Sequence, residues 1–345
     1  MLTVYTLDKA KEWDKLVQSF KNHDVYWLSG YLKGFMIHGE GEPCLLYYND
    51  GTTRAINAVM KRDLSNCQYF KDKVGKGEWF DFSTPYGYGG WLVEGDNFEG
   101  LFSEYKKWCV DNNIVSEFVR FHPIIKNHLN MDVLYNVVPL GETVTMDLSS
   151  KETVWENLTS KNRNVIRKAE KNGITIHFSS EESVFEEFKA IYNSTMDKDN
   201  ADDYYYFKKE FYDSVRNDLP NNAGIFYAKL DDKIVSASII LFCNGMLNYH
   251  LSGSVREFSR LAPTNLLLCE VAKWGSENGY KTFYLGGGVG SEEDSLFKFK
   301  KAFYKGDDLN RFYIGKCIFN QEKYNQLVKM RGEITKTGFF PLYRV

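Results

Sequence analysis

Cysteine, histidine and long apolar runs are scarce in this sequence. Its 345 residues include six cysteines and six histidines. No two cysteines form a CxxC pair and none lies beside a histidine at metal-ligand spacing, so we expect reduced thiols and no metal site. No segment approaches the roughly 20 continuous apolar residues of a membrane-spanning helix, and no apolar run follows a basic start as in a signal peptide. The sequence therefore predicts a cytoplasmic protein without a transmembrane segment.

A large excess of either charge is absent as well. The chain has 43 Lys and Arg against 46 Asp and Glu, a formal net charge of -3. Because a protein that binds DNA along its surface needs a strong positive excess, we expect no DNA partner, although one local basic patch can still bind an anion. Aromatic residues, in contrast, make up 16% of the chain and include 23 tyrosines. That supply can fill a core and indicates a wet cleft that stacks on or hydrogen-bonds a polar ligand.

Two stretches of the chain repeat one order of predicted elements: helix, hairpin, strand, helix, strand. The first hairpin turns at Asn49–Gly51 and the second at Asp231–Asp232. A chain of 345 residues also has the length of about two domains. We therefore predict an α/β fold of two similar units, each a mixed sheet flanked by helices. The first should cover residues 1–148, with a tail at 320–345 that packs back on it, and the second should cover 149–319.

A strongly basic helix is predicted over TSKNRNVIRKAEKNG, residues 159–173. Ser160 or Thr159 can cap its start. Arg163 and Arg167 are four residues apart and therefore share one face, where two guanidinium groups can bind a phosphate with forked hydrogen bonds. A solvated basic face is the other interpretation, and the residues leave both open.

A second helix is predicted over SLFKFKKAFYKGDD, with one lysine on its apolar side. Leu296, Phe299 and Phe303 form that side, and Lys300 lies among them. A lysine in such a stripe must extend its amine to solvent, meet an anion or hold a catalytic charge. In the functional interpretation, Lys300 reaches into a cleft toward a carbonyl oxygen or a phosphate.

The segment NYHLSGSVREFSRLAPTN leads from a predicted strand into a predicted helix. His250 is a candidate general base, although a single histidine in a strand is more often structural. Ser252 is a candidate ligand contact in the same segment. Arg260 lies just before the start of the helix, where backbone N–H groups favour an anion.

Two glycine-containing loops complete the candidate site. YLGGGVGSEED is neither a GxGxxG fingerprint nor a P-loop, and its acidic residues would repel phosphate. Its glycines, Gly287 among them, let the backbone approach a ligand closely or simply turn the chain. PYGYGG presents Tyr86 and Tyr88, which can stack a sugar or peptide, although a turn of this composition needs no function.

The order of these motifs resembles a known family. KNRNVIRKAEKNG, GSVREFSRLAPTNLLLCEVAKW, FYLGGGVG and FKFKKAF, preceded by PYGYGG and FVRFHP, are similar to segments of the Fem-type (FemAB-like) peptidoglycan bridge aminoacyltransferases and the related GNAT-superfamily acyltransferases. The resemblance implies two GNAT-like units and an N-acyltransferase. Its acceptor would be a primary amine of a cell-envelope precursor, such as a peptidoglycan peptide or a nucleotide-linked amino sugar. It also implies that Arg163 and Arg167 hold phosphates and that Lys300 faces the transferring carbonyl.

Two departures from the family pattern leave the donor open. The GNAT pyrophosphate loop, [RQ]xxGxG/A, is replaced by SRLAPTN, which weakens an acetyl-CoA interpretation. No heptad run forms the coiled-coil arm of some bridge transferases, which weakens tRNA binding without excluding it. We therefore expect either acyl-CoA or aminoacyl-tRNA as donor. The alternative function is a non-catalytic module that binds a phosphorylated sugar or an RNA end.

Overall fold

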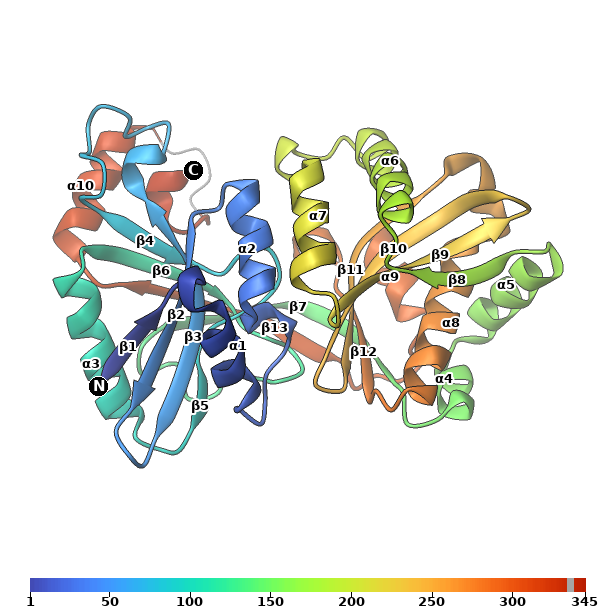
Figure 1. Cartoon of the computed structure of the whole chain (residues 1–345), viewed down its shortest axis with the longest axis horizontal. Helices are drawn as coiled ribbons and strands as arrows, with labels where there is room; N and C mark the ends of the chain where they lie inside the picture. The colour runs from blue at the N-terminus through green and yellow to red at the C-terminus, as the bar shows by residue number, and fades with distance from the viewer. Residues whose placement is uncertain (334–337) are drawn as a thin grey trace. The chain divides into compact units, whose positions relative to one another are not determined.

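The computed structural model describes residues 1–333 and 338–345, which form two compact units. Unit 1 consists of residues 1–140 and 312–345, and unit 2 of residues 141–311 (Figure 1). Each unit has a mixed sheet flanked by helices, so the predicted α/β class with two similar units is confirmed. Within the predicted tail, residues 334–337 lie outside the described residues.

The sheet of unit 1 is mixed because β4 and β6 pair in parallel, whereas the neighbouring pairs are antiparallel. Its strands, in spatial order, are β1 (Leu2–Tyr5), β2 (Glu42–Asn49), β3 (Arg54–Asp63), β4 (Phe80–Ser83), β6 (Ile114–Arg120) and β13 (Asn310–Ile318), and β5 (Leu92–Glu94) pairs with β3. Its helices are α1 (Ala10–Gln18), α2 (Ser29–His38), α3 (Phe98–Asp111) and α10 (Gln321–Arg331), with 3-10 turns η1 (Leu7–Lys9), η2 (Val25–Trp27), η3 (Leu64–Asn66) and η7 (Leu342–Arg344).

Helices cover both faces of this sheet because successive side chains of a strand point to opposite sides. On β6, Ile114 packs in the cluster that contains Phe102 of α3, whereas Val115 packs in the cluster that contains Leu327 of α10. The end of the chain joins the second cluster, where the side chain of Tyr343 is fully buried. The tail residues after 338 therefore pack within unit 1.

Unit 2 repeats this arrangement, with β11 and β12 as its parallel pair. Its strands, in spatial order, are β7 (Asn136–Asp147), β12 (Thr282–Gly286), β11 (Met246–Ser254), β10 (Lys233–Cys243), β9 (Ala223–Leu230) and β8 (Thr175–Ser179). Its helices are α4 (Lys151–Asn157), α5 (Ser160–Lys171), α6 (Glu182–Lys198), α7 (Lys209–Asp218), α8 (Pro263–Glu277) and α9 (Ser295–Lys301), with 3-10 turns η4 (Asp203–Tyr205), η5 (Arg256–Leu261) and η6 (Val289–Ser291).

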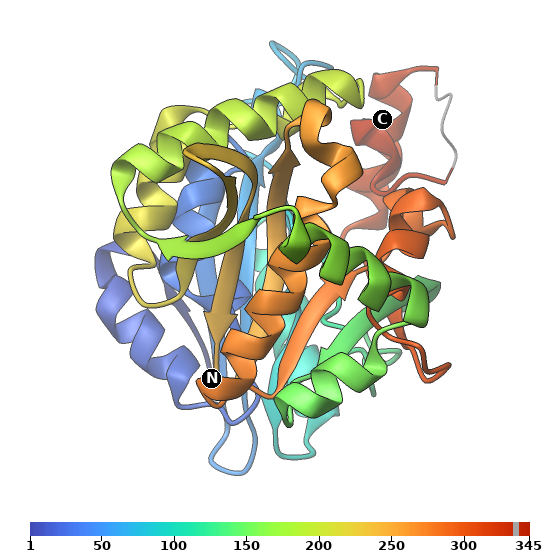
Figure 2. The same ribbon diagram turned by 90° about the vertical axis from the view of Figure 1, so that its right-hand side faces the viewer.

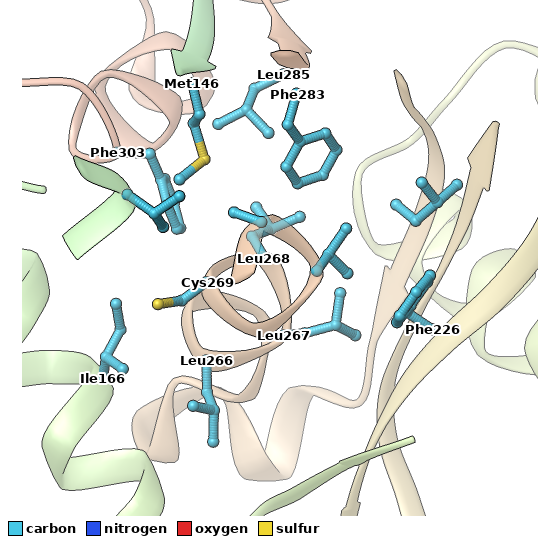
Figure 3. Packing of buried hydrophobic residues seen from close by; sticks show 14 of the residues in the cluster. Met146, Ile166, Phe226, Leu266, Leu267, Leu268, Cys269, Phe283, Leu285 and Phe303 are labelled. Atoms are coloured by element: carbon cyan, nitrogen blue, oxygen red, sulfur yellow. The ribbon is translucent and has the colours of Figure 1, made fainter. Parts of the chain in front are cut away.

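Helix α8 is the centre of the core of unit 2. It lies across one face of the sheet and is covered on its outer side by α4 and α5, while α6 and α7 cover the other face (Figure 2). A helix enclosed in this way must be apolar around most of its circumference, which explains the consecutive buried residues Leu266, Leu267 and Leu268. Figure 3 shows them pointing to different sides of α8, among Ile166 of α5 and Phe283 of β12.

The limits of the two units differ from the predicted ones because one edge strand of each sheet comes from an unexpected part of the chain. Residues 144–147 of β7 pair with β12 in unit 2, although they were assigned to the first unit. Residues 314–318 of β13 pair with β6 in unit 1, although they were assigned to the second. A strand belongs to the sheet with which it forms hydrogen bonds, and pairing over such sequence distances leaves no local pattern.

Candidate functional site

The parallel strands in the middle of the unit 2 sheet stay paired over only a short stretch. Residues 246–248 of β11 pair with 282–284 of β12, and beyond this β11 pairs with β10 alone among the described strands. His250 is the extra residue of a bulge, since the register with β10 shifts there. Two parallel strands that part at their carboxyl ends form the usual place for a ligand in an α/β sheet. Chain segments that follow these two ends supply several of the candidate residues.

Lys300 lies at the carboxyl end of β12, with its amine inside the protein. It is only 9% exposed, and its Nζ donates a 2.7 Å hydrogen bond to the carbonyl oxygen of Gly287. Asp294 caps α9 by accepting from the backbone N–H of Phe297 at 2.8 Å. The expected apolar face is wrong at Leu296, which is 36% exposed, because Phe297 turns inward in its place. The prediction of a lysine enclosed by apolar residues is nevertheless confirmed.

The protonation of Lys300 is set by its surroundings. Burial lowers the pKa of its ammonium group to about 8, and the nearby carboxylate of Asp294 partly opposes this shift by favouring the charged form. At pH 7 the amine therefore still carries its proton. An ammonium group held away from bulk water stabilises a developing oxyanion more strongly than an exposed one.

The backbone of Gly287 accepts the hydrogen bond from Lys300 and packs closely against β7. A Cβ at this position would come within 2.8 Å of the carbonyl oxygen of Glu142 on β7. At the preceding Gly286 the backbone has a φ of +84°, which side-chain-bearing residues rarely adopt. The two glycines thus let the loop pass beside β7 and turn a carbonyl oxygen toward the lysine.

Helix α5 forms as its sequence predicted, with Thr159 as its cap. The Thr159 side chain accepts from the backbone N–H of Asn162. The guanidinium of Arg163, however, donates to carbonyl oxygens at the end of α4, including that of Leu158 at 2.7 Å. Arg167 is exposed and lies 5.1 Å from the centre of the Trp155 ring. Both arginines therefore have partners on α4, and Arg163 satisfies carbonyls that a helix end leaves without donors.

His250, Ser252 and Arg260 lie along the segment from β11 to α8. Burial lowers the pKa of His250 to about 3, so its imidazole is neutral at pH 7 but binds a proton weakly. The Oγ of Ser252 accepts a 2.9 Å hydrogen bond from the hydroxyl of Ser238. Arg260 is exposed in η5, two residues before the cap of α8.

Tyr86 and Tyr88 belong to unit 1, whereas the other predicted site residues belong to unit 2. The carbonyl oxygen of Tyr86 accepts a hydrogen bond from the hydroxyl of Tyr31. The ring of Tyr88 lies 5.3 Å, centre to centre, from the rings of both Tyr26 and His122. These tyrosines form part of an aromatic cluster in unit 1.

Unit 2 also contains an open pocket of about 610 Å³ between the start of α5 and α9. It is lined by Glu142, Thr159, Glu293, Phe297, Lys298, Lys301, Ala302, Asp307 and Leu309. The two lysines face three carboxylates, so the pocket does not select for anions by charge alone. Sequence reasoning missed most of these residues because β7, α5 and α9 are brought together only by the fold.

The described residues, 1–333 and 338–345, contain no cluster of three or more His, Cys, Asp or Glu side chains placed to hold a metal ion. Nor does this part of the chain include a helix that combines the length and the apolarity needed to cross a bilayer. The six cysteines are free thiols.

The part of the chain that contains the candidate site of unit 2 is similar to known proteins. Residues 158–301 match the Acetyltransferase (GNAT) domain family. The UDP-N-acetylmuramoylpentapeptide-lysine N(6)-alanyltransferase of Weissella viridescens is 26% identical over 216 residues. This match covers 60% of the chain and spans 58% of the length of the relative, which is less than two thirds.

Solved structures resemble the fold over nearly the whole chain. The crystal structure of FemX superposes with a TM-score of 0.66 at 16% identity, covering 94% of this chain and 99% of that one. The C-terminal domain of a putative lysylphosphatidylglycerol synthetase from Agrobacterium fabrum gives a TM-score of 0.56 at 14% identity, covering 92% of each chain. At such identities the likeness concerns the fold. With the GNAT match over residues 158–301 and the alanyltransferase relative, it supports the resemblance seen in the motifs: the chain is similar to the FemAB-like proteins of the GNAT superfamily.

Proposed function

We propose that the protein is a cytoplasmic N-acyltransferase that moves an acyl or aminoacyl group to a primary amine of a cell-envelope precursor. The donor is an acyl-CoA or an aminoacyl-tRNA, and the acceptor is a peptidoglycan peptide or a nucleotide-linked amino sugar. The observation that supports this most strongly is the buried, protonated Lys300 at the point where β11 and β12 part. A cation in that position serves a reaction in which negative charge develops on a carbonyl oxygen.

The reaction needs few groups from the protein. The neutral amine attacks the carbonyl carbon of the donor ester or thioester, a C–N bond forms, and the carbonyl oxygen becomes an oxyanion. Lys300 stabilises this oxyanion. As the intermediate collapses, the C–O bond to RNA or the C–S bond to CoA breaks, and the proton released by the amine ends on the leaving oxygen or sulfur.

The proton does not need His250 as its carrier. With a pKa of about 3, the imidazole of His250 is neutral at pH 7 and could accept a proton. Its affinity for that proton is too low, however, for it to take one from the attacking amine. We propose a substrate-assisted transfer from the amine to the leaving group instead. His250 then acts through its position in the bulge of β11, where it shapes the opening between the strands.

The remaining predicted residues have binding roles in this proposal. Arg260, exposed before the start of α8, and Arg167 are available to contact phosphates of the substrates. Ser252 is a candidate for an acceptor contact in unit 2, and Tyr86 and Tyr88 are candidates for stacking a sugar or peptide on unit 1. Arg163 supports the site indirectly, since its guanidinium already joins the end of α4 to the start of α5.

The test is transfer by the purified protein. We would incubate it with alanyl-tRNA or acetyl-CoA and with a UDP-N-acetylmuramoyl pentapeptide, the acceptor named for the Weissella relative, and detect the amide product by mass spectrometry. Lys300→Ala should lower turnover about 100-fold or more, the usual effect of losing an oxyanion partner. Lys305→Ala, which removes an exposed lysine just after α9, is the matched control.

Two outcomes would contradict the proposal in different ways. Equal turnover of Lys300→Ala and wild type would remove this lysine from the mechanism. Tight binding of the acceptor without amide formation from any donor would favour the non-catalytic binding module.

A further inference from the structure

Asp294 connects two segments of unit 2 that both contact Lys300. We call residues 286–291 the glycine loop; it begins at the end of β12 and leads through two exposed glutamates to Asp294. The Oδ2 atom of Asp294 accepts a 3.3 Å hydrogen bond from the backbone N–H of Val289 in this loop. Its Oδ1 atom accepts at 2.8 Å from the backbone N–H of Phe297 in α9. One carboxylate therefore holds the loop with one oxygen and the helix with the other.

The relative position of these two segments sets the geometry of Lys300. The carbonyl group that accepts the 2.7 Å hydrogen bond from the lysine belongs to Gly287, two residues before Val289. Lys300 itself follows Phe297 by three residues and shares its helix face. A shift of the glycine loop relative to α9 would therefore change the distance between the lysine amine and the loop carbonyl directly.

The backbone of the glycine loop is closely packed on the Asp294 carboxylate. A Cβ at Gly288 would lie 2.5 Å from Oδ1 of Asp294. On the side of β7, a Cβ at Gly141 would collide with the carbonyl oxygen of Ser291, at the end of the loop. The loop thus lies between β7 and the carboxylate, and losing the contact with Asp294 would free one of its two sides.

Asp294 also acts on Lys300 through its charge. The hydrogen bond from the backbone N–H of Phe297 lowers the pKa of Asp294, so its carboxylate is charged at pH 7. That negative charge favours the ammonium form of Lys300 and opposes part of the effect of burial on its pKa. Other charged or titratable side chains on the elements around the lysine include those of Glu142, His250, Tyr284, Glu292, Glu293, Lys298 and Lys301.

A helix cap alone does not require this carboxylate. Asn, Asp and Ser cap helices about equally well, because one side-chain oxygen is enough. Among the described α-helices, the others with a side-chain cap use uncharged residues: Asn97, Ser150, Thr159 and Asn320. The second oxygen and the negative charge of Asp294 are therefore features beyond capping.

We propose that Asp294 is a positioning residue of the transfer reaction, which holds the amine of Lys300 in place by joining the glycine loop to α9. The inference rests on the proposed function, because it assigns the support of the lysine on which that function depends. Asp294 acts through Lys300 and takes no part in the bond changes. Its loss should therefore affect turnover more than substrate binding.

The experiment compares three single substitutions in the full-length protein. Asp294→Asn keeps an oxygen that can cap α9 but loses the charge and the acceptor for Val289. Asp294→Glu keeps the charge and moves it outward by one methylene group. The matched control is Glu292→Gln, which removes one negative charge from an exposed position two residues earlier. We would measure kcat and KM for transfer between about pH 6 and about pH 9.5, and melting temperatures check that each variant is folded.

We expect Asp294→Asn to lower kcat about tenfold or more and to change KM by less than about twofold. The fall of kcat as Lys300 loses its proton, above its pKa of about 8, should move to lower pH because the neighbouring carboxylate is gone. Asp294→Glu should return this fall toward the wild-type pH, and Glu292→Gln should behave as wild type.

Two outcomes would overturn the inference. Wild-type kcat and an unchanged pH profile in Asp294→Asn would show that the residue only caps α9. An equal loss of kcat in Asp294→Asn and Glu292→Gln would show a general effect of charge.

A second measurement separates the inference from the proposed function. NMR titration of isotope-labelled lysine side chains, with the Lys300 signal assigned by its absence in Lys300→Met, follows the amine without any substrate. We expect a lower titration midpoint in Asp294→Asn than in wild type, and equal midpoints would overturn the inference while the transferase stands. If the wild type forms no amide from any donor, the proposed function fails, and a lower midpoint in Asp294→Asn still supports the link between Asp294 and Lys300.

Discussion

At the scale of a single residue, Lys300 has one feature that the local sequence predicts and one that it does not. Its place among apolar side chains could be predicted, because helix periodicity puts Lys300 on the same face as Phe297 and Phe303, three residues before and after it. Its hydrogen bond to the carbonyl oxygen of Gly287 could not be predicted, because that atom lies thirteen positions earlier in a loop whose path depends on β7. The acceptor, and with it the direction of the amine, is a tertiary feature.

A buried ammonium group should also lower stability. The folded protein holds the pKa of Lys300 at about 8, below its usual value of 10.5. Lys300→Met removes this unfavourable burial, and we expect it to raise the free energy of unfolding at pH 7 by up to about 3 kcal/mol. The variant would thus be more stable than wild type while it loses transfer activity.

The sign of this effect with pH follows from linkage. Between pH 8 and 10.5 the unfolded chain binds more protons at this lysine than the folded one, so wild-type stability from this group rises with pH. The advantage of Lys300→Met should therefore be smaller at pH 9.5 than at pH 7. Thermal unfolding of both proteins at the two pH values measures it, and a constant or growing advantage would contradict the assigned pKa.

At the scale of elements, three helices of unit 2 meet at Asn162. This side chain is 2% exposed; its Nδ2 donates to the carbonyl oxygen of Ala302 at 3.2 Å, and its Oδ1 accepts from Asn265 at 2.8 Å. One amide thus joins the start of α5, the end of α9 and the start of α8. These contacts hold the helix that bears Lys300 in place relative to the sheet.

Replacing Asn162 should loosen this junction. Asn162→Leu leaves the Asn265 amide without its partner and removes a donor to Ala302, so we expect the free energy of unfolding to fall by about 1 to 3 kcal/mol. Asn164→Leu, at an exposed position of the same helix, is the control and should change it by less than about 0.5 kcal/mol. Urea denaturation measures both, and an equal effect of the two substitutions would show that the buried amide contributes nothing specific.

At the scale of the whole molecule, unit 1 is completed by the segment that follows unit 2. Asp81 on β4 is fully buried and bonds Arg62, Tyr343 and Arg344. Burial alone would raise the pKa of Asp81, but Arg344 and Arg62 lower it below its usual value. Without the end of the chain this carboxylate would lose two of these partners, and β6 would lose β13.

This organisation predicts which fragments fold. We expect residues 141–311 to unfold cooperatively when expressed alone, since they contain the paired part of β7 and the rest of their sheet. Residues 1–148 should not, because they leave Asp81 buried without Arg344 and expose the edge of β6. Circular dichroism during thermal unfolding distinguishes the two cases. A cooperative transition in the fragment 1–148 would contradict the role assigned to the C-terminal segment.

The sequence by itself determined the features that arise within a dozen residues: the two hairpins, the cap and basic face of α5, the enclosed lysine of α9 and the motif order of the FemAB-like proteins. Turn chemistry, capping and helix periodicity act over that range. Only the tertiary structure decided that Arg163 supports α4, that Lys300 binds a loop carbonyl, and that β7 and β13 complete sheets other than those expected. These contacts join residues far apart in the chain, such as Ser116 and Ile318 in the β6–β13 ladder. Strands pair through backbone hydrogen bonds, so the side chains of one strand do not identify its neighbour.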